Sequence, residues 1–86
     1  MTRYACPCCG YKTFDRKDNV WDICQVCFWQ NDTSLPHQTS GANHGMTLAQ
    51  AQQHFISFGA CDIAMLKNVR LPRKNEARDE NWQPYP

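Results

Sequence analysis

Two pairs of cysteines are the residues of this chain best suited to chemistry. Each pair has two residues between its thiols and fourteen residues separate the pairs, which are Cys6 with Cys9 and Cys24 with Cys27. Such a turn brings two sulfurs to the separation of ~3.7–3.8 Å that a tetrahedron with ~2.3 Å zinc–sulfur bonds requires. The pattern predicts one Zn²⁺ per chain. Because four thiolates leave no open coordination position, we expect a structural centre and no enzyme activity.

The residues next to the two pairs differ. Gly10 follows Cys9, where a positive φ lets backbone amides point at a thiolate, and Pro7 fixes φ within the turn. The second pair has no such glycine, because Phe28 follows Cys27. A redox-active or disulfide-bonded pair is the alternative, but a thioredoxin-like motif needs a βαβ setting that neither pair has.

Two more cysteines and three histidines leave other chemistry open. We expect Cys8 to be a packed non-ligand thiol; the alternatives are a ligand in a shifted register and a reactive thiol activated by the metal. Cys61 is expected to be buried and apolar. His37, His44 and His54 show no metal-binding spacing, and a second site would have to draw on Cys61, His44 and Cys8.

Composition bounds the class of protein. A chain of 86 residues, 42% hydrophobic and 20% charged, is one globular domain that is marginally stable without a metal or disulfides. Its net charge is +1. Binding of one divalent cation to four thiolates would change this charge to −1, because four protons leave and two positive charges enter. The chain therefore lacks the basic excess of a nucleic-acid binder. The chain shows no transmembrane run and no secretory signal, which predicts a cytoplasmic protein with reduced thiols.

One helix is predicted over residues 47–58. Thr47 and Gln50 form a capping box at its start, and Gly59 suits a left-handed cap at its end. The apolar stripe, which should pack on the metal half of the molecule, consists of Leu48, Ala51, Phe55 and Phe58. The residues expected to lie away from this stripe are Gln52, Gln53 and Ser57.

The strand signals are weaker. Residues 12–14 and 20–23 suggest a β-hairpin that joins the two cysteine pairs, and residues 66–71 suggest a strand that ends at Pro72. A basic run follows the helix and is interpreted as solvated surface, with nucleic-acid contact as the alternative; it comprises Lys67, Arg70, Arg73 and Lys74. Most aromatic side chains near the metal, Trp21 among them, should be core. Trp29, Trp82 and Tyr85 are the better candidates for an exposed partner surface, although core is favoured for each.

Two blocks of residues resemble the bacterial cysteine-rich CPCC family. They are residues 6–13 with 22–29, and residues 41–48 with 55–61, and the likeness spans roughly residues 4–72. The resemblance implies a small intracellular protein that binds zinc through its cysteine pairs. Gln25 stands where this family would have proline.

These observations predict a small, metal-stabilised α+β domain: a zinc-ribbon or rubredoxin-like pair of cysteine turns with one packed helix. Residues 1–72 form the domain and residues 73–86 an extended tail. We expect a non-catalytic module that presents residues 30–46 and the tail to another protein, without a membrane. A nucleic-acid-binding zinc ribbon and a thiol-based redox or metal-responsive protein are the alternatives.

Overall fold

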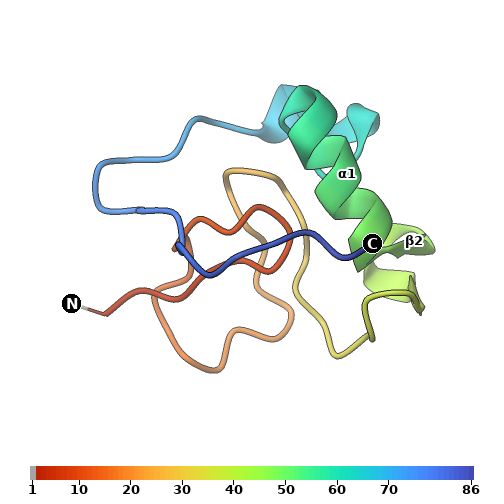
Figure 1. The fold of residues 1–86 in the computed structure, drawn as a ribbon, viewed down its shortest axis with the longest axis horizontal. Helices are drawn as coiled ribbons and strands as arrows, with labels where there is room; N and C mark the ends of the chain where they lie inside the picture. Colours follow the sequence, from red (N-terminus) through yellow and green to blue (C-terminus); the bar gives the residue numbers. More distant parts are fainter. Residues whose placement is uncertain (1) are drawn as a thin grey trace.

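The helix forms where its capping signals place it. A computed structural model describes residues 2–86, and its helix α1 spans Leu48–Phe58 (Figure 1). The Thr47 hydroxyl accepts a hydrogen bond from the Gln50 amide at 3.1 Å, and the Gln50 side chain accepts one from the Thr47 amide at 3.0 Å. Gly59 ends the helix with φ of 87°, a conformation that costs a residue with a Cβ about 1 kcal/mol or more. The predicted helix and both of its caps are confirmed.

The buried stripe of α1 is wider than predicted. Leu48 and Ala51 are buried as expected, and Phe55 packs against the core half-buried. Gln52, however, is only 1% exposed, so the prediction that it lies away from the stripe is wrong. Its amide is buried because both ends have partners: Nε2 donates to the Pro7 carbonyl and Oε1 accepts from the Tyr85 amide.

The other regular elements are short. Strand β1 (Thr39–Ser40) pairs antiparallel with β2 (Met46–Thr47), and the 3₁₀ turn η1 (Gly41–Asn43) lies between them. The chain enters α1 directly from β2. Residues 66–71 do not form the predicted strand, because a second 3₁₀ helix, η2, occupies Ile63–Asn68 and is capped by the Asp62 side chain on the Ile63 amide.

Each cysteine pair closes its own loop. Tyr4 exchanges two backbone hydrogen bonds with Phe14 around the first pair, and Ile23 bridges to Gln30 around the second. The predicted hairpin between the pairs is therefore wrong: residues 12–14 return to the strand-like segment before Cys6 and do not pair with residues 20–23. Local closure satisfies the backbone of each loop without the partner loop.

The core lies between the two cysteine loops and α1. In Figure 1 the helix flanks the loops, and the C-terminal segment crosses the first of them on its way to the helix. The buried apolar cluster comprises all six cysteines with Phe14, Val26, Trp29, Leu48 and Ala51. The structure is thus a small α+β domain whose buried core consists largely of cysteine side chains. Among residues 2–86, no helix has both the length and the apolar character that a bilayer crossing requires.

Candidate metal centre

The two cysteine loops have the same backbone design. In the first, the Gly10 amide donates to the Cys6 carbonyl at 2.8 Å; in the second, the Phe28 amide donates to the Cys24 carbonyl at 2.7 Å. Gly10 has φ of 80° and Phe28 has φ of 70°. Phe28 therefore adopts the left-handed conformation that a glycine would adopt more cheaply, and the absence of glycine from the second pair does not change the turn.

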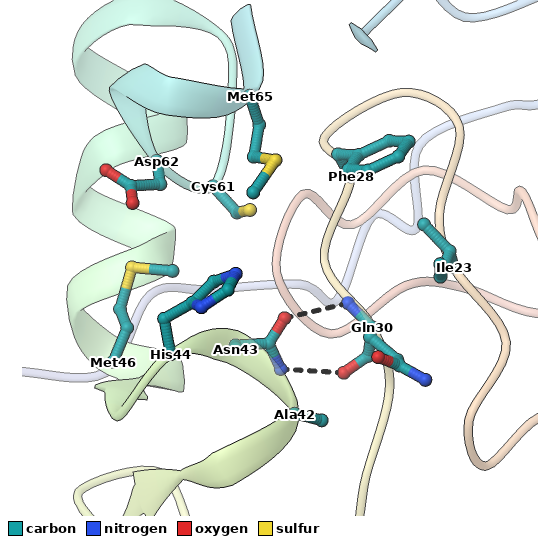
Figure 2. Close-up of a pocket in the computed structure, with 10 residues that line it drawn as sticks. All are labelled: Ile23, Phe28, Gln30, Ala42, Asn43, His44, Met46, Cys61, Asp62 and Met65. Carbon is teal, nitrogen blue, oxygen red and sulfur yellow. Dashed lines mark hydrogen bonds between the residues drawn. The ribbon is translucent and has the colours of Figure 1, made fainter.

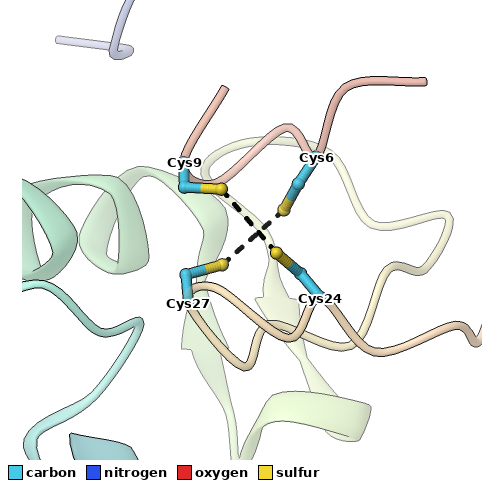
Figure 3. Close-up of side chains that lie close together, drawn as sticks. All are labelled: Cys6, Cys9, Cys24 and Cys27. Carbon is cyan, nitrogen blue, oxygen red and sulfur yellow. Dashed lines mark hydrogen bonds between the residues drawn. The ribbon is translucent and has the colours of Figure 1, made fainter. Parts of the chain in front are cut away.

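The two loops face each other and bring four sulfurs together (Figure 3). The Sγ atoms of Cys6 and Cys27 are 3.7 Å apart, as are those of Cys9 and Cys24, and all four lie within 4.8 Å of one another. The separation of 3.7 Å matches the edge of a tetrahedron with ~2.3 Å metal–sulfur bonds. All four side chains are fully buried. The cluster thus has the geometry to hold one metal ion.

The electrostatics of the cluster favour a cation. Burial raises the pKa of Cys6 and of Cys27 well above the ordinary thiol value. The pKa of Cys24 is lowered, chiefly by the hydrogen bond from Cys27, and the Thr13 hydroxyl adds a bond at 3.1 Å. The surroundings thus favour the thiolate form of Cys24, and four buried thiolates together would require a positive ion between them.

The remaining thiols lie outside this cluster. Cys8 is fully buried beside the ligand set, as the packed, non-ligand interpretation predicts. Cys61 is 2% exposed, and burial, followed by the nearby Cys8, raises its pKa to about 12. It is therefore a neutral thiol near pH 7, as expected of a buried, apolar cysteine. A reactive role for Cys8 stays a prediction.

Cys61 faces a cavity of about 140 Å³ beside the metal centre (Figure 2). Its walls include Phe28, Met65 and His44, but Cys8 is not among the lining residues. His54 bonds to the Cys61 carbonyl at 2.9 Å, while His37 and His44 are exposed. Within residues 2–86, the four cysteines are the only group of three or more potential Cys, His, Asp or Glu ligands.

Asn43 binds the backbone of Gln30 at the end of the second cysteine loop, a role that the sequence did not predict. Its Oδ1 accepts from the Gln30 amide at 2.9 Å, and its Nδ2 donates to the Gln30 carbonyl at 2.8 Å (Figure 2). The same Nδ2 also donates to Ser40. Asn43 is 5% exposed, so a single buried amide connects η1 to the loop of Cys24 and Cys27. In the sequence, only its position between Gly41 and Gly45 indicates such a role.

The basic run after α1 is not simply solvated surface. Arg70 forms a bidentate salt bridge with Glu76, with N–O distances of 2.7 and 2.9 Å. The Arg73 amide donates to the same carboxylate at 2.7 Å. Glu76 is 2% exposed, and its pKa falls to about 2, chiefly through Arg70. The prediction of solvated surface is wrong for Arg70, whereas Lys67 and Lys74 are exposed. Nucleic-acid contact stays a prediction.

The exposed aromatic residues differ from those predicted. Trp21 is 60% exposed, so its assignment to the core is wrong. Trp29 is 1% exposed and belongs to the core, whereas Tyr85 is 44% exposed. Trp21 also has φ of 75°, which is an outlier for a bulky residue. A large exposed side chain on a strained backbone often marks a functional position.

Comparison with known proteins identifies one family. The family described as Cysteine-rich CPCC matches residues 4–76, a range that contains all six cysteines. No curated protein matches the chain significantly, and neither does any solved structure. The match ends ten residues before the C-terminus, so the segment that crosses the first cysteine loop lies outside it.

Proposed function

This chain belongs to the cysteine-rich CPCC family, and we propose that it is a structural zinc protein that acts as a non-catalytic module for binding another protein. One Zn²⁺ bound to Cys6, Cys9, Cys24 and Cys27 would hold its two loops together in the manner of a zinc ribbon. Six reduced thiols fit a reducing compartment, which for this chain we propose to be the cytoplasm.

The separation of the sulfurs carries the proposal. Two diagonal pairs at 3.7 Å, drawn from two turns of equal geometry, provide four ligands in a fully buried site. A closed set of four thiolates has no position at which a water or a substrate could be activated. In zinc-finger peptides, binding of this kind contributes roughly 10–16 kcal/mol, which exceeds the typical net stability of a small domain, about 5–15 kcal/mol.

Metal analysis tests the first half of the proposal. Four thiolates in a tetrahedron bind zinc or iron, and native mass spectrometry of protein purified from its host distinguishes the two by mass. We expect one zinc per chain, and a Cys24→Ser variant that loses it. Iron in its place would contradict the choice of metal, and a metal-free chain would contradict the centre itself.

An apolar surface beside the metal centre supports the second half. Trp21 is 60% exposed and Ile23 is 39% exposed, and Ile23 lines the cavity that Cys61 and Phe28 also line. Exposed aromatic side chains and apolar pockets are both typical of protein-binding surfaces; Trp21 lies two residues before Ile23 but does not itself line the cavity. Among residues 2–86, no lysine or arginine lines this cavity, which favours an apolar side chain of a protein partner over a phosphate backbone.

Affinity capture from the native host tests the binding role. Trp21→Ala removes the exposed ring, whereas Leu71→Ala removes a side chain that is 87% exposed and lies away from the cavity. We expect wild-type protein and Leu71→Ala to retain the same protein partner and Trp21→Ala to lose it. Equal recovery by all three proteins would exclude this surface. Salt-sensitive retention of RNA or DNA would favour the nucleic-acid alternative.

A further inference from the structure

The carbonyl groups of the first cysteine loop are bound by residues far away in the sequence. The Pro7 carbonyl accepts from the Trp82 indole at 2.8 Å and from Gln52 at 2.9 Å. The Cys9 carbonyl accepts from Arg78 Nε at 3.1 Å. The carbonyls of the second loop bind residues 61 and 70, inside the family match, whereas Arg78 and Trp82 lie outside it.

Backbone pairing continues this contact. The Asp79 amide donates to the Gly10 carbonyl at 2.7 Å, and the Lys12 amide donates to the Ala77 carbonyl at 2.9 Å. A Cβ on Gly10 would lie 2.6 Å from the Trp82 ring. The glycine after Cys9 is thus needed twice, once for its positive φ and once for the close approach of this indole.

Arg78 and Gln52 tie the segment to its surroundings. The Arg78 guanidinium lies 5.0 Å from the centre of the Tyr11 ring and 4.5 Å from that of Trp82, so it is held between two aromatic faces. The side-chain amide of Gln52 connects α1 to Pro7 through its nitrogen and to Tyr85 through its oxygen. The C-terminal segment, the first cysteine loop and the helix therefore form one hydrogen-bonded unit.

We propose that residues 77–85, which we name the C-terminal strap, are positioning residues that hold the first cysteine loop on the metal and set how fast the metal leaves. This inference rests on the proposed metal centre. Cys6 and Cys9 share one loop, so movement of that loop would break two of the four metal–sulfur bonds and would let a chelator take the metal from Cys24 and Cys27. The strap holds the carbonyls of Pro7, Cys9 and Gly10, and its contacts must break before the loop moves.

The rate of metal release tests the strap. Zinc-loaded protein is mixed with excess chromogenic chelator at pH 7, and the first-order rate of zinc transfer is measured. Trp82→Ala removes one partly buried hydrogen bond and one cation–π contact, so we expect release roughly tenfold faster. The absorption of the cobalt-substituted protein should stay that of four thiolates, because the strap supplies no ligand. Where Trp82→Ala loads poorly, Arg78→Lys carries the test, since it keeps the charge and loses the Nε bond to Cys9.

Two controls separate positioning from general destabilisation. Gln83→Ala alters an exposed residue of the strap, and Gly59→Ala strains the end of α1, which lies outside the strap. We expect both to release zinc at the wild-type rate. If zinc-loaded wild type releases zinc as fast as Trp82→Ala or Arg78→Lys, the proposed role of the strap is refuted, but the metal centre is not. The same holds if Gly59→Ala accelerates release as much as these variants do. A wild-type chain that binds no metal would overturn the proposed centre and the strap with it.

Discussion

Replacing Glu76 by glutamine should be among the most destabilising single changes outside the metal centre. The carboxylate accepts two hydrogen bonds from Arg70 and one from the Arg73 amide, and Arg3 lies 3.6 Å away. Its side chain is 1% exposed. Glutamine places an NH₂ group opposite donors that need an acceptor, and the Arg70 guanidinium, whose side chain is 30% exposed, loses its countercharge.

The pKa of Glu76 gives the magnitude. Folding lowers it from 4.5 to about 2, and each pKa unit corresponds to 1.36 kcal/mol, so the charged form contributes about 3 kcal/mol. Breaking a fully buried ion pair by removal of one partner costs ~3–5 kcal/mol, and because Arg70 is partly exposed this pair should lie at the lower end of that range. Because the pKa is lowered on folding, this stability is present above pH 4.5 and is lost as the pH falls towards 2.

Urea denaturation of the zinc-loaded protein measures this effect. Glu76→Gln should lower the free energy of unfolding by about 3 kcal/mol, with the same difference from wild type at pH 7 and at pH 5 and a smaller one below pH 4.5. Glu80→Gln makes the same chemical change at an exposed site and should stay within about 0.5 kcal/mol of wild type. Equal stability of the two variants, or a difference that grows as the pH falls, would refute the reasoning.

Two further changes test the loops. Asn43→Ala should cost about 1–3 kcal/mol of unfolding free energy in the same denaturation experiment, because it leaves the partly buried amide and carbonyl of Gln30 without the side chain that binds them; a loss below ~0.5 kcal/mol would show that water replaces the side chain. Trp21→Gly should leave stability unchanged or raise it by about 1 kcal/mol, since its positive φ suits glycine and the ring is 60% exposed. A clear loss of stability by thermal unfolding would instead show that Trp21 packs in the fold.

The sequence predicts those features whose interactions are local. The caps of α1 depend on residues three positions apart, so Thr47, Gln50 and Gly59 indicate both ends of the helix. The cysteine turns are equally local, because two residues between thiols fix their separation. Even Phe28 follows this logic, since the turn imposes its positive φ.

Contacts between distant residues were not predictable in this way. Gln52 looks like a surface residue of an amphipathic helix, and only Pro7 and Tyr85, far along the chain, satisfy its buried amide. In the sequence, Glu76 is one acidic residue after a basic run, and only the folded structure shows its ion pair with Arg70. The pairing of Tyr4 with Phe14 depends on each cysteine loop closing on itself, which the spacing between the pairs does not specify.

The most direct measurement is the dispersion of the amide NMR spectrum before and after exhaustive chelation, on protein whose zinc content has been counted. One zinc per chain, a dispersed spectrum with the metal, a collapsed one without it and recovery on adding one equivalent of Zn²⁺ are the predicted results. A metal-depleted chain that keeps its dispersed spectrum would contradict the claim that four cysteines and one ion hold this fold together.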